Sequence, residues 1–160
     1  MTFPDRRPAV IFDRDGTLAS CQRHLVSDGQ KNWDEFNGWL PFDAVVREVA
    51  ALFQLIRQHT DLALIVTTGR TDNLRPQMLA WLEKYALTPD RLYMRRHGDQ
   101  RVDSTVKREI YVNFIEPEFD VQLVVDDRPQ VVEMWRSIGL PVLAVSDPSI
   151  KPPILEQNDA

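Results

Sequence analysis

The sequence predicts an α/β fold in which helices cover both faces of a central parallel sheet. Short, continuous runs of Val, Ile, Leu and Phe recur along the chain, which is typical of parallel strands that are buried on both faces. Amphipathic segments with a helical period separate these runs. The connections between the runs and the segments are short, as expected where strands and helices alternate in a doubly wound sheet.

Predicted strands and helices alternate along the chain. The predicted strands are residues 9–12, 62–66, 91–94, 121–125 and 140–145, and the predicted helices are residues 42–59, 75–85, 105–115 and 129–138. The first helix carries apolar residues at 42, 45, 46, 49, 52, 53 and 56, which form one stripe at the 3.6-residue period. Pro117 follows the third helix, and the fourth begins with Pro129 and ends at Gly139, positions that these residue types favour.

Two segments depart from this alternation. Residues 19–40 form a polar insertion after the first strand, which we interpret as a small cap. Its aromatic residues Trp33, Phe36 and Trp39 either pack the insertion or stack on a base or sugar of a substrate. Residues 147–160 are proline-rich and are predicted to be a frayed tail. We expect residues 1–160 to form a single domain, because this length is typical of one domain.

Composition narrows the class of protein further. The 160 residues include 19 basic and 24 acidic side chains, a net charge of −5, which argues against a protein that coats nucleic acid. Residues 91–108 are the exception, because six basic residues there outnumber two acidic ones; such a stretch suits a phosphorylated end. The single cysteine, Cys21, indicates a reducing compartment, and the apolar runs are far shorter than the ~20 residues of a membrane helix. We therefore expect a cytoplasmic protein with no membrane partner.

Three predicted strands run into polar clusters. These clusters are Asp13-Arg14-Asp15-Gly16-Thr17, Thr68-Gly69-Arg70 and Asp126-Asp127-Arg128. Each alone is also a usual turn or helix cap. In an open parallel sheet, however, the carboxyl ends of the strands share the edge where ligands bind. Three clusters of this kind therefore predict one site.

The carboxylates of these clusters indicate a bound cation. Two carboxylates ~4 Å apart repel each other by about 4 kcal/mol at an effective dielectric constant near 20. Asp13, Asp15, Asp126 and Asp127 would therefore destabilise a shared pocket unless a cation offset their charge. Oxygen ligands without His or Cys suit Mg²⁺, which keeps coordination positions for water and substrate phosphate. The sequence thus predicts a site for Mg²⁺-assisted phosphoryl chemistry.

The same clusters resemble the motifs of the haloacid dehalogenase (HAD) superfamily of phosphohydrolases. Residues 11–18 resemble the first motif, the strand that runs into Thr68 the second, Lys107 the third, and Asp126-Asp127 the fourth. A narrower resemblance, in Thr68-Gly69-Arg70, residues 99–110 and residues 126–139, is to the phosphatase domain of phage-type polynucleotide kinase/3′-phosphatase. The resemblance implies a three-layer, Rossmann-like HAD fold with a minimal cap after the first strand.

The resemblance also implies a role for each catalytic residue. Asp13 would attack phosphorus and form an aspartyl-phosphate. Asp15 would act as the general acid toward the leaving oxygen and then as the base toward water. Thr68 would donate a hydrogen bond to the transferring phosphoryl group, and Lys107 would offset its charge and that of the nucleophile.

Metal and substrate binding follow from the same resemblance. Magnesium would be held by Asp13, the main-chain carbonyl of Asp15, Asp126 and Asp127, and which of the last two contacts the ion directly stays open. Substrate binding is implied for Arg23, Gly69, Arg70 and Asp103. Arg23 is displaced by about one residue from the family position, Arg70 has the alternative of a surface arginine, and Asp103 has the alternative of a helix N-cap.

These roles predict a Mg²⁺-dependent phosphatase that removes 3′-phosphates from DNA or RNA ends. Two alternatives remain: a phosphatase of mononucleotides or other small phosphomonoesters, and a phospho-acceptor signalling module like a response-regulator receiver. A receiver pairs its acids after the first strand and carries its acceptor aspartate on a later one, whereas here the DxD motif comes first. The sequence contains no GxxxxGK[ST] loop, so kinase or ligase steps of the same pathway are expected from a separate chain.

Overall fold

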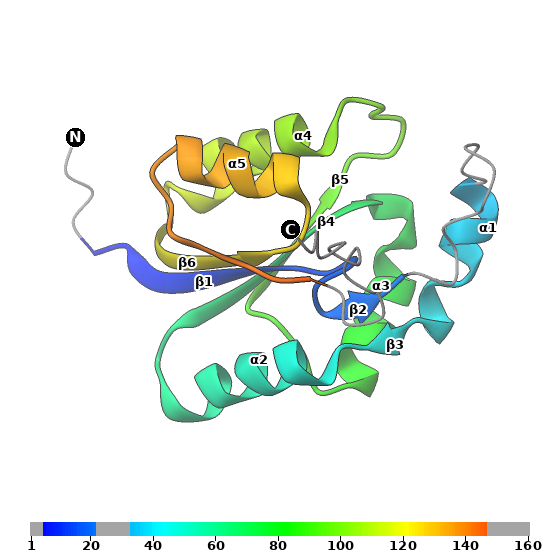
Figure 1. Ribbon diagram of the computed structural model, residues 1–160, viewed down its shortest axis with the longest axis horizontal. Coiled ribbons are helices and arrows are strands. Elements are labelled where there is room, and N and C mark those ends of the chain that lie inside the picture. The colour runs from blue at the N-terminus through cyan, green and yellow to red at the C-terminus, as the bar shows by residue number, and fades with distance from the viewer. Residues whose placement is uncertain (1–4, 22–32, 147–160) are drawn as a thin grey trace, which may run out of the picture.

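The computed structural model describes residues 5–21 and 33–146, and its main feature is a five-stranded sheet in the order β5-β4-β1-β6-β7 (Figure 1). Its strands are β1 (Arg7–Asp13), β4 (Ala63–Thr71), β5 (Arg91–Arg95), β6 (Phe119–Asp126) and β7 (Val142–Ala144). Every neighbouring pair is parallel. The sheet confirms the predicted fold class, and each predicted strand overlaps an observed one.

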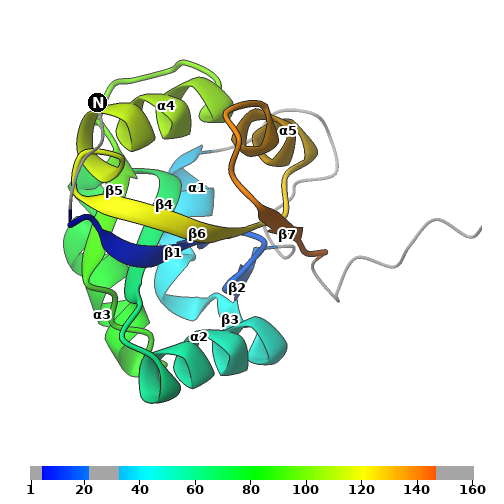
Figure 2. The same ribbon diagram turned by 90° about the vertical axis from the view of Figure 1, so that its left-hand side faces the viewer.

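Helices cover both faces of the sheet and make three layers (Figures 1 and 2). They are α2 (Arg47–His59) and α3 (Arg75–Lys84) on one face, and α4 (Asp103–Ile110) and α5 (Pro129–Ser137) on the other. The alternation of side chains along β1 builds both cores: Val10 and Phe12 pack with α2 and α3, whereas Ala9 and Ile11 pack with α4 and α5. Burial on both faces explains why the strand sequences are continuously apolar.

The helix predicted over residues 42–59 begins later than expected, at Arg47. Before it, the chain forms a 3₁₀ turn (Leu40–Phe42) and a short strand, β3 (Ala44–Val45), which pairs antiparallel with β2 (Ala19–Ser20). The apolar stripe was misleading here, because Phe42 is 68% exposed while the intervening Asp43 is buried. The helix predicted over residues 105–115 is α4 followed by a π-helical turn (Tyr111–Ile115).

The insertion between β1 and α2 lies at the carboxyl edge of the sheet. Its helix α1 (Trp33–Gly38) consists of exposed and half-buried residues, and Figure 1 places it beside the ends of the strands. A further 3₁₀ turn, Asp72–Leu74, joins β4 to α3. Residues 22–32 of the insertion and the predicted tail, residues 147–160, lie outside the described residues. Across residues 5–21 and 33–146, the helices are too short or too polar to cross a membrane.

Candidate active site

The floor of the site is formed where β1 and β6 end side by side. Asp13 is the last residue of β1, Asp126 is the last of β6, and the α4 residue Lys107 reaches between them. The Lys107 Nζ donates to Asp13 Oδ1 at 2.6 Å and to Asp126 Oδ2 at 3.0 Å. Thr17 Oγ1 donates to the other Asp13 oxygen at 2.9 Å. The structure therefore brings together the first, third and fourth sequence motifs, with Asp13, Lys107 and Asp126 all buried.

The charges of this floor are strongly interdependent. Burial raises the pKa of Asp13, and the neighbouring Asp126 and Asp127 raise it further, while Lys107 opposes them. Burial alone would lower the pKa of Lys107, but Asp13 and Asp126 outweigh burial and raise the pKa well above that of an ordinary lysine. Lys107 is thus a fixed cation whose charge favours the ionised form of Asp13.

The two aspartates of the fourth motif have different surroundings. Asp126 Oδ1 accepts the backbone N–H groups of Asp127 (2.9 Å) and Arg128 (3.4 Å), and Oδ2 accepts Lys107 Nζ (3.0 Å) and the indole N–H of Trp135 (3.1 Å). These four donors occupy the acceptor positions that a carboxylate offers. Asp127 is half-buried, and its Oδ1 accepts Thr17 Oγ1 at 3.3 Å. Asp127 is therefore the better placed of the two to bind something new.

Gly16 is required by the position of Asp127. Its φ of +89° lies in the left-handed region that favours glycine, and a Cβ on Gly16 would collide with the Asp127 carboxylate. The DxDGT motif therefore needs glycine at this position so that the loop after β1 can pass directly beneath the fourth-motif carboxylate.

Two groups of acidic residues in the described ranges have the geometry to hold a metal ion. In the first, one oxygen from each of Asp13, Asp126 and Asp127 lies within 4.8 Å of the others. Three carboxylates with one lysine among them leave an excess of negative charge, and an all-oxygen donor set fits Mg²⁺. The second group is Asp15, Cys21 and Asp43, whose carboxylates already pair with two arginines.

Asp15 is held by a network of donors at the rim of the floor. It accepts Arg14 Nη1 at 2.7 Å, Arg70 Nε at 3.1 Å and Thr68 Oγ1 at 2.8 Å. Burial would raise the pKa of Asp15, but the two guanidinium groups and the threonine hydroxyl outweigh burial and lower the pKa below its usual range. Asp15 is accordingly ionised in this arrangement, and the fully buried Thr68 donates its hydroxyl hydrogen to Asp15.

Sequence reasoning missed the ion pair that supports this network. Arg14 Nη1 lies 2.7 Å from Asp43 Oδ2, with both side chains fully buried, and the Arg14 guanidinium stacks 4.3 Å from the ring of Trp81. Trp81 also donates its indole N–H to the Asp43 carbonyl at 2.9 Å. Asp43 lies between the stripe positions 42 and 45, where an amphipathic helix normally carries a polar residue, so the sequence carried no signal of this buried pair.

Of the predicted substrate-binding residues, Arg70 contacts both Asp15 and the helix α1. Arg70 is buried, and besides Asp15 its Nη1 donates to the Phe36 carbonyl (2.9 Å) and Asn37 Oδ1 (3.2 Å) of α1. Its guanidinium therefore joins the cap to Asp15, in place of the open fork expected for phosphate. Arg23 lies outside the described residues.

Gly69 and Asp103 pack directly against each other. A Cβ on Gly69 would lie 2.5 Å from Asp103 Oδ1, so the residue at position 69 must be small. Asp103 is the first residue of α4 and pairs with Arg95 at 3.3 Å and Lys107 at 3.7 Å. The N-cap position belongs to Val102, so the alternative role of Asp103 as the N-cap is not what the structure shows. Asp103 instead pairs with three cations beside the floor, the third being Arg128 at 3.7 Å.

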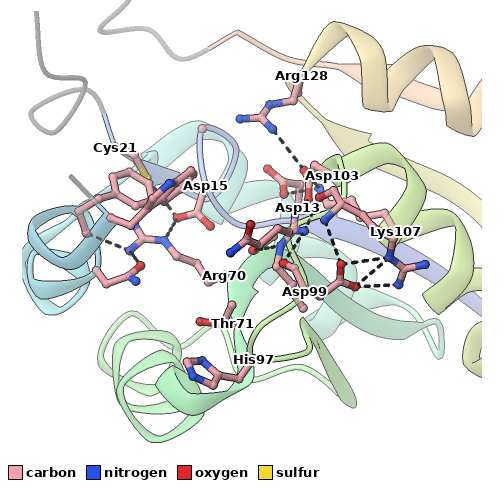
Figure 3. A pocket seen from close by; sticks show the side chains of 18 of the residues that line it. Asp13, Asp15, Cys21, Arg70, Thr71, His97, Asp99, Asp103, Lys107 and Arg128 are labelled. Atoms are coloured by element: carbon pink, nitrogen blue, oxygen red, sulfur yellow. Dashed lines mark hydrogen bonds and ion pairs between the residues drawn. The ribbon is translucent and has the colours of Figure 1, made fainter. Parts of the chain in front are cut away.

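One pocket of about 780 Å³ lies at the carboxyl edge of the sheet (Figure 3), and its lining includes Asp13, Asp15, Lys107, Asp126 and Asp127. Its walls come from α1 on one side and the loop between β5 and α4 on the other. Carboxylates partly neutralise the basic stretch of residues 91–108, because Arg101 pairs with Asp99 (2.7 Å) and Glu109 (2.6 Å), and Arg91 of β5 pairs with Glu118 (3.4 Å). Arg128, half-exposed at the start of α5, also reaches the pocket.

The fold and the convergence of the four motifs define a phosphohydrolase domain of the HAD type. A haloacid dehalogenase-like hydrolase from Streptococcus pneumoniae matches 86% of this chain over 84% of its own, with a TM-score of 0.59 and 12% identity. That likeness concerns the fold alone. The structure of a Pnkp1/Rnl/Hen1 complex is more similar: one of its chains matches with a TM-score of 0.73 and 31% identity, over 91% of this chain and 49% of that chain.

The sequence comparison identifies the family. Residues 7–149 match the profile of the family described as the polynucleotide kinase PNKP phosphatase domain, and the chain belongs to this family. A protein of Autographa californica nuclear polyhedrosis virus, described as a bifunctional polynucleotide kinase/RNA ligase, is 27% identical over 136 residues, which cover 84% of this chain and 19% of the viral protein. The chain thus spans about half of the matched chain of the Pnkp1/Rnl/Hen1 complex and about a fifth of the viral protein. The family to which the chain belongs consists of phosphatase domains, which hydrolyse phosphate esters.

Proposed function

We propose that this chain is a Mg²⁺-dependent phosphatase that removes 3′-phosphates from polynucleotide ends through an aspartyl-phosphate on Asp13. The observation that carries the proposal is the floor of the pocket, where a buried carboxylate is held on both oxygens. Lys107 binds one oxygen at 2.6 Å and Thr17 binds the other at 2.9 Å. A carboxylate fixed in this way is a preorganised nucleophile for a phosphorus atom that enters from the pocket, and Lys107 together with bound Mg²⁺ would offset the burial that raises its pKa and so keep it ionised.

The donor set of the floor fits magnesium. Asp13 and Asp127 present oxygens to the pocket, while Asp126, whose acceptor positions are occupied, would orient Lys107 and the backbone of the motif. We infer that Asp127 and the main-chain carbonyl of Asp15 contact the ion directly. Asp126 would not contact the ion and would instead orient the groups around it. When bound, Mg²⁺ would offset the carboxylate charges and the charge of the substrate phosphate.

In the first step, an oxygen of Asp13 would form a bond to phosphorus while the bond from phosphorus to the 3′-oxygen of the substrate breaks. Lys107 would offset the charge on the phosphoryl oxygens as they move toward the floor. The leaving 3′-oxygen needs a proton, and Asp15 is the carboxyl at the rim that would donate it. Because Arg14, Arg70 and Thr68 keep Asp15 ionised, it would first take up this proton from solvent as the substrate binds. The negative charge of the substrate phosphate would favour this uptake, since like charges disfavour ionisation.

In the second step, water would attack phosphorus, the bond from phosphorus to Asp13 would break, and inorganic phosphate would leave. The water must lose a proton as it attacks. Asp15 is ionised in the described arrangement and accepts hydrogen bonds from Arg14, Arg70 and Thr68. The observed network therefore matches the state in which Asp15 serves as the base.

The polynucleotide part of the proposal rests on the family and on the pocket. The family is that of a polynucleotide kinase phosphatase domain. The pocket of about 780 Å³ is larger than a phosphate group needs and lies within the usual range for sites that bind nucleotide-sized ligands. Both observations favour a phosphate attached to a nucleotide.

A substrate panel tests the proposal. The full chain is incubated with Mg²⁺ and matched oligonucleotides that carry a 3′-phosphate or a 5′-phosphate, in DNA and RNA, and with a nucleoside 3′-monophosphate. We expect the highest kcat/KM on the 3′-phosphorylated oligonucleotides, loss of activity with a chelator, and loss of activity in Asp13→Asn. Asp120→Asn changes an exposed carboxylate of β6 and is the matched control that keeps activity. A preference for the mononucleotide would refute the polynucleotide assignment.

A further inference from the structure

We propose that Trp33 is a stacking platform for the nucleobase of the nucleotide that carries the reacting phosphate. The inference rests on the proposed function and assigns a subsite within the same pocket. Trp33 is the first residue of α1, lines the pocket, and is 58% exposed. By contrast, the tryptophans of the sheet-packing helices, Trp81 and Trp135, are 2% and 0% exposed. An indole at the rim of a pocket offers the flat apolar face on which bases of any sequence stack.

The ring of Trp33 is braced by Phe36. The two rings meet edge to face, with their centroids 5.8 Å apart and their planes at 85°. Phe36 is only half-buried, so this pair forms an apolar wall along one side of the pocket. Edge-to-face contact between aromatic rings is a favourable arrangement. This contact orients the indole, which is 58% exposed.

Arg70 connects this wall to the catalytic centre. Its guanidinium lies 3.7 Å from the centroid of the Phe36 ring, and the same group donates through Nε to Asp15 Oδ1 at 3.1 Å. Arg70 also holds the Phe36 carbonyl at 2.9 Å. A continuous series of contacts therefore runs from Asp15 through Arg70 and Phe36 to Trp33, and Figure 3 shows Asp15 and Arg70 together at the side of the pocket where α1 lies.

The series of contacts has a consequence for substrate selection. The base platform and the group proposed to protonate the leaving oxygen are held in one frame, so a base seated on Trp33 would place its own 3′-phosphate relative to Asp15. A phosphate without a base gains none of this positioning. The inference therefore predicts discrimination between ends with and without a terminal base, although it predicts little discrimination among the four bases.

The test compares two 3′-phosphorylated oligonucleotides that differ only at the last nucleotide, one with a normal base and one with a tetrahydrofuran abasic analogue. Wild-type protein should prefer the normal end. In Trp33→Ala, kcat/KM on the normal end should fall roughly 5- to 150-fold, the range for loss of one stacked base, and should stay unchanged on the abasic end. Trp33→Phe should restore most of the preference, because it retains a ring.

A matched control lies on the same insertion. Trp39 is 44% exposed and packs edge-on against Phe42, with centroids 5.9 Å apart, outside the lining of the pocket. Trp39→Ala should therefore keep the wild-type preference. Equal losses on both ends in Trp33→Ala, or an unchanged preference, would overturn the inference while leaving the phosphatase intact. If wild-type protein hydrolyses p-nitrophenyl phosphate but neither oligonucleotide, the polynucleotide function fails and the subsite fails with it.

Discussion

Substitution of Trp135 tests which contacts stabilise the proposed magnesium site. Its indole N–H donates to Asp126 Oδ2 at 3.1 Å, and its ring is 0% exposed and packs edge-on against Tyr111 at 6.0 Å. Trp135→Phe keeps an aromatic ring in place and removes this donor. Asp126 then retains Lys107 and two backbone N–H groups. The substitution therefore isolates one hydrogen bond behind the proposed magnesium site.

Two effects of Trp135→Phe can be sized from the structure. A buried charged group that loses a hydrogen bond costs about 1.5–3 kcal/mol, and the smaller ring adds a cavity penalty, so the free energy of unfolding should fall by about 2–4 kcal/mol. Asp126 is itself the partner that supports the inferred metal ligand Asp127, and loss of such a partner typically weakens metal affinity or activity about 10- to 100-fold. Loss of one of the four donors to Asp126 should therefore raise the Mg²⁺ requirement, within that limit. Urea denaturation measures the first effect, and the Mg²⁺ concentration that gives half-maximal phosphatase activity measures the second.

The control for this experiment is Phe53→Leu. Phe53 is fully buried on the opposite face of the sheet, where its ring lies 5.2 Å from that of Phe12. This substitution should lower stability while the Mg²⁺ requirement stays that of the wild type. If Trp135→Phe destabilises the protein but leaves the Mg²⁺ requirement unchanged, the indole is only a core residue and our account of Asp126 is wrong.

Three further substitutions test other parts of the structure. Gly16→Ala should abolish activity and lower Tm, because the new Cβ would displace the Asp127 carboxylate; wild-type activity would contradict the loop geometry. Asp43→Asn, which breaks a fully buried pair with Arg14, should lower the free energy of unfolding by about 3–5 kcal/mol in urea; a loss under 1 kcal/mol would count against it. Burial raises the pKa of Asp90, but its hydrogen bonds outweigh burial and hold the pKa below its usual value. The ionised carboxylate therefore stabilises the fold above about pH 4, and this stabilisation is lost as the pH falls further. The loss of Tm in Asp90→Asn should accordingly become smaller as the pH falls below about 4.

Much of the fold was predictable because segments that are buried on both faces have a continuously apolar sequence. Strands covered on both faces are continuously apolar, so β1 and β6 could be located to within two residues at each end. Proline and glycine marked the limits of α5. The predicted helix over residues 42–59 failed at its start because periodicity cannot distinguish an apolar stripe from an exposed aromatic beside a buried charge. Contacts from distant parts of the chain hold that segment out of the helix: Arg14 and Arg70 pair with Asp43, and β3 pairs with β2.

The positions of the candidate catalytic residues were predictable for a similar reason, whereas their contacts were not. Parallel strands end at one edge, so residues that follow β1, β4 and β6 had to meet. The distribution of donors between Asp126 and Asp127 depends on Trp135 and Lys107, which lie on two different helices, α5 and α4. Likewise, the contact of Arg70 with the cap arises from packing, and a motif alone cannot indicate which of several acceptors a buried guanidinium selects.

The most direct test of the central claim is to trap the covalent intermediate on Asp13. The protein is mixed with Mg²⁺ and an oligonucleotide carrying a ³²P-labelled 3′-phosphate, quenched with acid within the first turnover, and digested for peptide mapping. We predict label on the peptide that contains Asp13, before free phosphate accumulates, and none in Asp13→Asn. Release of labelled phosphate with no labelled protein at any time in the first turnover, or label on another peptide, would contradict the account.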